Sequence, residues 1–411
     1  MSTNGCETGD LVRCSVGGSE LEGTYITVRD GIAVVKLSSG YNIGVDVSDC
    51  HLLQKQEIPE APEPSDIPQD NGLPKVSIVS TGGTIASRID YRTGAVTSQF
   101  RATDILHAIP GLSGIARFRA IQLCNILSEN MTPVIWQQLA RAIYDEVRDG
   151  AVGVLVTHGT DTMAYSAAAI SFMVRTPVPI VFVGSQRSAD RPSSDNLMNG
   201  LCAAAAAVSD LGEVVVVMHG STSDEICAIH RGTRVRKMHT SRRDAFQSHG
   251  INPIGLISYP ALAVSLSDDA VRRGQNELVL DDQIEERCGL LYYYPGMDPA
   301  ILTAYTGYRG LVLAGTGLGH VSSAFIVRIR ELINSGMLIM MTSQCLHGRV
   351  CDRVYDTGRD LLDAGVIEGG DMLPEVALVK MMWVLGHSEG EDARIGIVQD
   401  VAGEMNRRSL A

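Results

Sequence analysis

The chain repeats one local pattern, in which a short and continuous run of apolar residues ends abruptly in small or polar residues. The four clearest examples are residues 76–80 before Thr81-Gly82-Gly83-Thr84, 152–156 before Thr157-His158-Gly159-Thr160-Asp161, 179–183 before Gly184-Ser185-Gln186, and 214–218 before His219-Gly220. An apolar run without polar alternation is typical of a strand that is buried on both faces. Such strands form parallel sheets covered by helices, and ligands collect beyond their carboxyl ends. The polar strand ends are therefore the candidate sites for chemistry.

Helical patterns lie between these runs, at residues 132–147, at residues 163–174 and in the alanine-rich stretch 196–208. A second set follows, with strands at 310–314 and 337–341 and helices at 322–334 and 373–385. Strands that alternate with helices predict the α/β class with a parallel sheet. We expect a large α/β domain over residues 74–290 and a smaller α/β domain over residues 291–411.

The first fifty residues have a different pattern. Short strands are predicted at residues 9–16, 22–28, 31–37 and 41–45, and glycine-containing turns separate them. Closely spaced short strands favour a small antiparallel barrel of the SH3-like kind over residues 1–53. Residues 54–73 are rich in proline and acid, which is typical of a stiff, solvated linker.

Composition narrows the range of functions. The 411 residues carry a net charge of −13, which argues against broad nonspecific binding of nucleic acid. The nine cysteines are scattered and odd in number, so they do not indicate a disulfide framework. The first residues lack a signal-peptide pattern, and no apolar run approaches the roughly 18 residues of a membrane span. We therefore expect a cytoplasmic protein with no membrane contact.

The segment Thr81-Gly82-Gly83-Thr84 follows its strand directly. Its glycines permit a tight turn and leave backbone amides free to face an anion or a developing oxyanion. A plain strand-to-helix turn or a phosphate-binding loop is an equally good interpretation of this segment alone. It lacks the Gly-Lys-Ser/Thr ending of a nucleotide-binding loop.

The segment His158-Gly159-Thr160-Asp161-Thr162 is denser in reactive groups. A threonine hydroxyl is a weak nucleophile that needs a base or a shared proton network. Asp161 is a candidate partner for a ligand ammonium or for a lysine. The alternative is that Thr160 or Asp161 caps the helix that begins near Met163. His158 alone is more typical of a structural residue than of a base.

Two further groups of residues have simple interpretations. The segment 231–243 contains five arginines and one lysine, which could contact RNA or a partner but are better explained by pairing with acidic side chains. Cys345, His347 and Cys351 form only a weak zinc motif because a fourth ligand is missing nearby. We predict no metal in this chain.

The two threonine-bearing strand ends resemble the two signature motifs of the L-asparaginase/glutaminase superfamily. The resemblance covers residues 75 to 388 and includes Gly315-Thr316-Gly317-Leu318-Gly319-His320 and Gly370-Asp371-Met372-Leu373-Pro374-Glu375. Within the superfamily, the SH3-like barrel before the body is similar to the family of D-type subunits of archaeal glutamyl-tRNA(Gln) amidotransferases. The resemblance implies an asparaginase-like body of two α/β domains behind that barrel.

The resemblance also implies a set of site residues. Thr84, Thr160 and Asp161 correspond to the two family threonines and the family aspartate, and Lys237 occupies the place of the family lysine. Ser128 and Glu129 match the substrate-holding pair, although many asparaginases carry glutamine where Glu129 stands. The backbone amides of Gly83 and Gly159 are candidates for the oxyanion site. We favour Thr84 as the nucleophile because it lies on the Gly-Gly turn, with Thr160 and Lys237 in proton transfer, but the sequence leaves the choice of threonine open.

The function that this resemblance implies is hydrolysis of glutamine, with delivery of ammonia to a partner of the E-subunit type. That partner would activate glutamyl-tRNA with ATP and magnesium and convert it to glutaminyl-tRNA, so tRNA would be bound through the partner. This chain itself needs no cofactor, and it is expected as a homodimer within a heterotetramer. A free-standing L-asparaginase with an appended barrel and a non-catalytic docking subunit remain alternatives.

Overall fold

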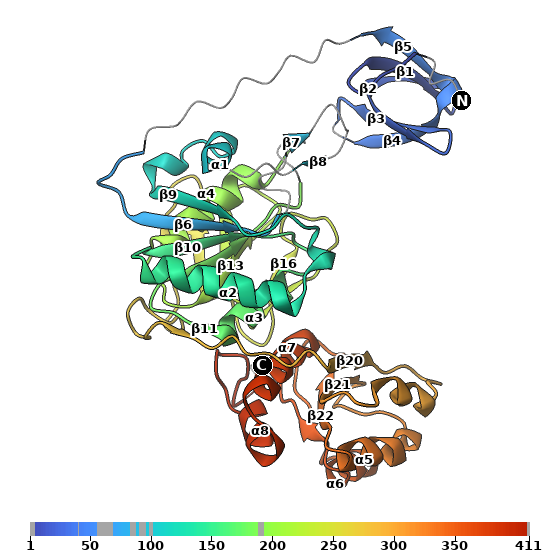
Figure 1. Cartoon of the computed structure of the whole chain (residues 1–411), viewed down its shortest axis with the longest axis vertical. Coiled ribbons are helices and arrows are strands. Elements are labelled where there is room, and N and C mark those ends of the chain that lie inside the picture. Colours follow the sequence, from blue (N-terminus) through green and yellow to red (C-terminus); the bar gives the residue numbers. More distant parts are fainter. Residues whose placement is uncertain are drawn as a thin grey trace.

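A computed structural model of the chain describes residues 5–39, 41–55, 69–82, 88–89, 96–97, 102–187 and 193–408 (Figure 1). The predicted site residues Gly83 and Thr84 lie outside these ranges, as does most of the predicted linker, residues 56–68. The α/β class and the parallel sheet predicted from the apolar runs are confirmed. The domain boundaries proposed above stay predictions.

The N-terminal residues form one five-stranded antiparallel sheet with the order β4-β3-β2-β1-β5. Its strands are β1 (Leu11–Val16), β2 (Ser19–Arg29), β3 (Ile32–Leu37), β4 (Asn42–Asp46) and β5 (Cys50–Gln54). Four of them were predicted, and β5 was missed because only its first residue, Cys50, is buried, so its sequence has no alternating pattern. Cys50 pairs with Cys14 of β1 and closes a small core. The SH3-like class of this sheet stays a prediction.

The main sheet has eight strands in the order β18-β17-β14-β13-β12-β10-β6-β9. Its five parallel strands are β9 (Arg117–Gln122), β6 (Lys75–Ser80), β10 (Gly153–Thr157), β12 (Ile180–Val183) and β13 (Val214–His219). Its antiparallel edge consists of β14 (Ile226–Arg231), β17 (Gly255–Ser258) and β18 (Val264–Leu266). This edge differs from the all-parallel expectation because the connection from β13 to β14 is too short for a crossover helix.

Helices cover both faces of the main sheet (Figure 1). On one face, α2 (Pro133–Arg148) and α3 (Met163–Met173) pack against Val79, Val154 and Val156. On the other face, α1 (Ala102–Ala108) and the alanine-rich α4 (Asn196–Ala207) pack against the alternate side chains Ile78, Leu155 and Val181. The two predicted helices at 163–174 and 196–208 therefore form with nearly the expected bounds.

The C-terminal part contains a four-stranded parallel sheet, β20-β21-β22-β23. Its strands are β20 (Cys288–Tyr292), β21 (Gly310–Gly315), β22 (Leu338–Ser343) and β23 (Ile367–Glu368). Helices α5 (Ile326–Asn334) and α6 (Asp356–Asp363) cover one face. Helix α7 (Pro374–His387) lies on the other face and also packs against α3, so one core joins the two sheets, and α8 (Gly390–Ile397) follows it.

Three two-stranded pairs complete the fold: β7 (Arg88–Ile89) with β8 (Val96–Thr97), β11 (Val174–Arg175) with β19 (Val279–Leu280), and β15 (Val235–Lys237) with β16 (Phe246–Ser248). Across the part of the chain that the structure describes, no helix combines the length and the apolar character needed to span a membrane.

Candidate active site at the carboxyl edge of the main sheet

The parallel register brings the two threonine-bearing strand ends side by side. Ser80, the last residue of β6, pairs with Thr157, the last residue of β10. The buried Thr81 hydroxyl donates a hydrogen bond of 3.1 Å to the Thr157 carbonyl oxygen, and the Thr157 hydroxyl donates one of 2.9 Å to Ser80 Oγ. Thr157 therefore cross-links the two strands at the point where the signature motifs begin.

Gly82 starts the Gly-Gly turn in a conformation that requires glycine. Its φ is +115°, and a Cβ atom there would lie 2.6 Å from the Ile126 carbonyl oxygen. Residues 83–87 are not among the described residues, so Gly83 and Thr84, for which we predicted oxyanion and nucleophile roles, fall outside them. Their roles stay predictions.

The second motif lies on the turn between β10 and α3. A Cβ atom on Gly159 would lie 2.7 Å from the Ser128 Cβ, so glycine allows Ser128 to approach this turn. The Thr162 hydroxyl donates a 2.6 Å hydrogen bond to the Ser128 carbonyl oxygen and holds the two segments together. The predicted substrate-holding Ser128 is thus placed beside the predicted oxyanion residue Gly159. Its neighbour Glu129 is exposed on the short helical turn Ser128–Asn130.

Lys237 reaches the same turn from a separate hairpin. It is the last residue of β15, where it pairs with Phe246 of β16. Its Nζ donates hydrogen bonds of 2.9 Å to Thr160 Oγ1 and 2.7 Å to Asp161 Oδ1. The lysine side chain is 12% exposed and the Asp161 side chain 70% exposed, so a shielded amine meets a solvent-facing carboxylate. The structure therefore brings Thr160, Asp161 and Lys237 together, and their catalytic roles stay predictions.

The alternative capping role for Thr160 and Asp161 does not fit the helix start. The N-cap residue of α3 is Thr162, and its side chain makes no capping hydrogen bond. Thr160 and Asp161 instead bind the lysine amine. The interpretation of His158 as structural is supported by its burial and by a 2.7 Å contact from its Nδ1 to the Gly159 carbonyl oxygen. Burial lowers the pKa of His158 to about 4, so the ring is neutral at pH 7.

Comparison with known proteins places this arrangement in a family. A family model of the asparaginase N-terminal domain matches residues 75–270, a glutaminase/asparaginase C-terminal model matches residues 287–395, and a GatD N-terminal domain model matches residues 6–53. The D-type subunit of the glutamyl-tRNA(Gln) amidotransferase of Methanosarcina mazei is 53% identical, over 98% of this chain and 99% of the relative. The corresponding chain of Archaeoglobus fulgidus is 54% identical, over 97% of this chain and 95% of the relative.

The chain belongs to the family of glutamyl-tRNA(Gln) amidotransferase D-type subunits, the GatD family.

Solved structures agree with this assignment for the body of the chain. The thermostable L-asparaginase from Thermococcus kodakarensis is 32% identical with a TM-score of 0.72, and the match covers 81% of this chain and 99% of that one. L-asparaginase I from Vibrio cholerae is 27% identical with a TM-score of 0.70, over 81% of this chain and 99% of that one. The GatD family therefore combines an asparaginase-like body with an additional N-terminal domain.

The arginine-rich segment of this GatD family member is an ion-paired structural segment. Arg231 pairs with Glu213, Arg234 with Asp371, Arg236 with Glu375, Arg242 with Asp244 and Arg243 with Asp224. The interpretation of these charges as paired with acidic side chains is confirmed. Cys345 and Cys351 are free thiols, and no three histidine, cysteine or acidic side chains within the described ranges are grouped to hold a metal ion.

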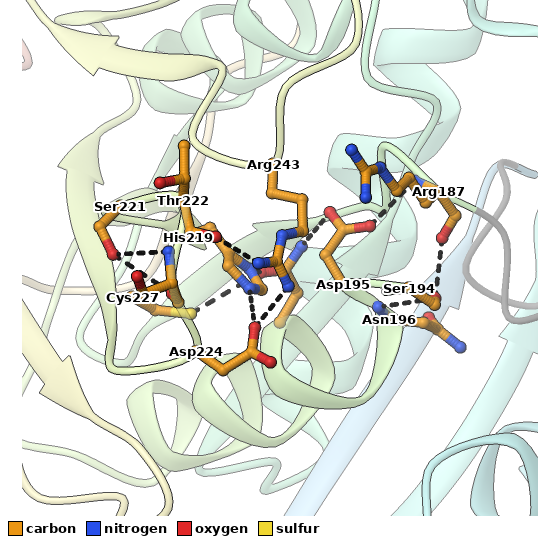
Figure 2. Close-up of polar contacts among 12 residues, drawn as sticks. Arg187, Ser194, Asp195, Asn196, His219, Ser221, Thr222, Asp224, Cys227 and Arg243 are labelled. Atoms are coloured by element: carbon orange, nitrogen blue, oxygen red, sulfur yellow. Dashed lines mark hydrogen bonds and ion pairs between the residues drawn. The ribbon is translucent and has the colours of Figure 1, made fainter. Parts of the chain in front are cut away.

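Sequence reasoning missed a polar network next to the site, and Figure 2 shows five of its members, Arg187, Asp195, His219, Asp224 and Arg243. It connects the loop after β12 with the loop of the Lys237 hairpin through side chains from α4, from the end of β13 and from the loop that follows β13. Its members are Ser185, Arg187, Asp195, Asn199, His219, Asp224 and Arg243. Polar residues at the ends of β12 and β13 were the signal in the sequence, but they lacked a known motif.

Proposed function

We propose that this chain is the glutaminase subunit of a tRNA-dependent amidotransferase. The observation that carries the proposal is the placement of Lys237 Nζ between Thr160 Oγ1 at 2.9 Å and Asp161 Oδ1 at 2.7 Å, at the carboxyl edge of a parallel sheet. A threonine next to a shielded amine is the combination that amide hydrolysis by a hydroxyl nucleophile needs. The GatD relatives supply the context in which the released ammonia is used.

The proposed reaction has two steps. In the first, a threonine oxygen attacks the side-chain amide carbon of glutamine while its proton passes to the Thr160–Lys237 pair and then to the departing ammonia. In the second, water attacks the acyl-threonine ester, which yields glutamate and the free hydroxyl. We assign the attack to Thr84 and the developing oxyanion to the amides of Gly83 and Gly159.

The same proposal assigns substrate binding to residues around the turn. Asp161 is largely exposed, so its carboxylate can accept the α-ammonium group of glutamine while it orients the lysine. Ser128 is buried against Gly159, and Glu129 is exposed beside it. A carboxylate at position 129 would supply a second acceptor for the same ammonium.

The ammonia would pass to a partner of the E-subunit type that converts Glu-tRNA(Gln) to Gln-tRNA(Gln). This partner would bind ATP, magnesium and the tRNA, and this chain would form a homodimer within a heterotetramer. Two relatives that match over nearly the whole chain are D-type subunits of glutamyl-tRNA(Gln) amidotransferases, which supports work in a complex with other subunits.

The test is ammonia release from glutamine by the full chain, alone and with the E-type partner, ATP and glutamyl-tRNA. We expect glutamine to be preferred over asparagine and the rate to rise when the partner and charged tRNA are added. Because the body is 32% identical to an L-asparaginase, the competing function is free-standing asparagine hydrolysis. If the chain hydrolyses asparagine quickly and the rate does not change when the partner and tRNA are added, the chain is a free-standing asparaginase and the proposal is rejected.

A further inference from the structure

A continuous chain of polar contacts joins the segment next to Thr160 to the hairpin that carries Lys237. Figure 2 shows its outer part, which consists of His219, Asp224 and Arg243. The chain of contacts belongs to neither of the two signature motifs. We call it the rear relay and define it as Asn199, His219, Asp224 and Arg243. Its inner end lies near Thr160, and its outer end lies in the hairpin loop.

The inner end is anchored on a fully buried carboxylate. Asp195 accepts hydrogen bonds from Ser185 Oγ at 2.7 Å and from the backbone amides of Gln186 and Arg187, each at 2.9 Å. These bonds hold the loop that follows β12. A Cβ atom on Gly184 in this loop would lie 2.9 Å from Thr160 Cγ2, so the loop backbone lies directly against Thr160.

Asn199 connects this loop to the next strand. Its Nδ2 donates to the Gly184 carbonyl oxygen at 3.0 Å and to Asp195 Oδ2 at 2.9 Å, which fixes the orientation of the amide. The Asn199 Oδ1 atom therefore faces His219 Nδ1, 2.6 Å away, and the imidazole donates to it. Both side chains are fully buried, so this bond is shielded from water.

His219 connects Asn199 at the inner end of the rear relay to Asp224 at its outer end. Its Nε2 lies 3.3 Å from Asp224 Oδ1, so both ring nitrogens face acceptors. Burial lowers the pKa of His219, whereas the carboxylates of Asp224 and Asp195 favour the protonated ring and Arg243 opposes it. The bond to Asn199 persists in both forms of the ring, and only the protonated ring also donates a hydrogen bond from Nε2 to Asp224.

The outer end holds the lysine hairpin. Arg243 lies in the loop between β15 and β16, and its Nη1 donates to Asp224 Oδ1 at 2.5 Å while Nη2 donates to the Thr222 carbonyl oxygen. The Met238 amide donates to the Ala245 carbonyl oxygen at 2.6 Å and closes this loop next to Lys237. The Arg243 side chain is only 14% exposed, so its two bonds are partly shielded from solvent.

We propose that the rear relay is a positioning device that holds the Lys237 hairpin and the Thr160 turn at the separation that their direct hydrogen bond requires. The hairpin strands are only three residues long, and lysine is flexible along four methylene groups, so the direct bond alone constrains the amine poorly. The bonds of Arg243 fix the hairpin that carries Lys237, and the bonds of Asn199 fix the loop that contacts Thr160. Together they limit the positions that the lysine amine can take relative to the Thr160 hydroxyl. The proposal rests on the proposed glutaminase function of the Thr160–Lys237 pair.

The test uses Arg243→Gln in the full chain, with Arg242→Gln as the matched control. Arg242 belongs to the same loop but pairs with Asp244 instead of the relay. We expect Arg243→Gln to lower kcat for glutamine about tenfold with KM changed less than about twofold, since small misplacements of catalytic groups act on kcat. Arg243→Lys should recover part of the loss, and Arg242→Gln should match the wild type. An unchanged kcat in Arg243→Gln, or an equal loss in Arg242→Gln, overturns the proposal.

A double variant tests whether the residues act as one unit. His219→Gln and Arg243→Gln should each lower kcat, and the double variant should lose no more than the more impaired single variant, because either break disconnects the same chain. Losses that multiply overturn the relay.

Hydrogen exchange separates this proposal from the proposed function. Arg243→Gln should speed amide exchange across residues 235–248 relative to Arg242→Gln, whether or not glutamine is the substrate. If the wild type and its partner complex release no ammonia from glutamine, the proposed function fails. If exchange in the hairpin is the same in both variants, the relay fails.

Discussion

The amine of Lys237 lies 2.9 Å from the hydroxyl of Thr160, although 77 residues separate them in the chain. Thr160 sits on a turn at the end of a central parallel strand, and Lys237 ends a strand of a small hairpin outside the main sheet. At this distance the Thr160 hydroxyl and the Lys237 amine can exchange a proton.

Replacing the lysine tests the pair directly. We expect Lys237→Met to lower kcat for glutamine hydrolysis by about 100-fold to 10,000-fold, the range for loss of a general acid–base group, because methionine keeps the chain length but cannot carry a proton. Lys75→Met is the control, since Lys75 lies at the opposite end of β6 and its amine binds the Asp149 carbonyl oxygen. A Lys237→Met protein with wild-type kcat would remove the lysine from the mechanism.

Gly159→Ala tests the close approach of Ser128 to the signature turn. The new methyl group would lie 2.7 Å from Ser128 Cβ and 3.0 Å from its Oγ, so one of the two segments must shift. We expect a raised KM for glutamine and a loss of about 1–3 kcal/mol in the free energy of unfolding, measured by urea denaturation. Gly114→Ala is the control because its Cβ would enter open space. Equal KM values in the two variants would contradict the proposed packing.

Because several histidines are buried, we expect the free energy of unfolding to decrease in mild acid. Burial lowers the pKa of His158 to about 4 and that of His249 to about 4, and burial together with His249 lowers the pKa of His230 to about 3. Between pH 6.5 and about 4 the unfolded chain binds protons that the folded chain excludes, so the free energy of unfolding decreases as pH falls through this range.

The histidine prediction is checked by urea denaturation at pH 7 and pH 5. His230→Gln should lose less stability than the wild type between these pH values, because one buried group no longer titrates. His51→Gln is the control, since His51 is exposed. If His230→Gln shows the wild-type pH dependence, the ring of His230 titrates normally in the folded chain.

Asp352 should give the opposite pH dependence. Burial, and after it the neighbouring Glu368, raise the pKa of Asp352 to about 7 from 3.8, and both of its carboxylate oxygens are buried without a hydrogen-bond partner among the described residues. Its contribution to stability is complete below pH 3.8 and is lost as pH rises through about 7. We therefore expect Asp352→Asn to gain stability over the wild type at pH 8 and to show a much smaller gain at pH 5, measured by urea denaturation. A constant difference at both pH values would show that the carboxyl group titrates normally.

Local pattern was sufficient for the larger part of the fold. The apolar runs at 76–80, 152–156, 179–183 and 214–218 became β6, β10, β12 and β13, because a strand buried on both faces favours apolar residues at most positions. The buried exceptions in β6 are the small residues Ser77 and Ser80. The strand β5 was not predicted, because one buried residue in five produces no periodic signal. The antiparallel edge of the main sheet was also missed, since strand direction depends on how far the connecting chain must travel.

Among the site residues, Thr160 and Asp161 could be chosen from the sequence because they follow a predicted strand directly, and Lys237 could be chosen only through resemblance to a family. The rear relay could not be predicted at all. Asn199, His219, Asp224 and Arg243 come from a helix, a strand end and two loops, and no spacing in the sequence connects them.

The sequence by itself determined which segments are strands and helices, because the period of apolar residues follows directly from backbone geometry. It also determined that reactive side chains stand at the strand ends. Only the tertiary structure decided which of these side chains meet, since hydrogen bonds act over about 3 Å and depend on packing between segments that are distant in the chain. Lys237 lies beside Thr160 because a hairpin, a helix and two loops place it there, and that placement is a property of the assembled fold.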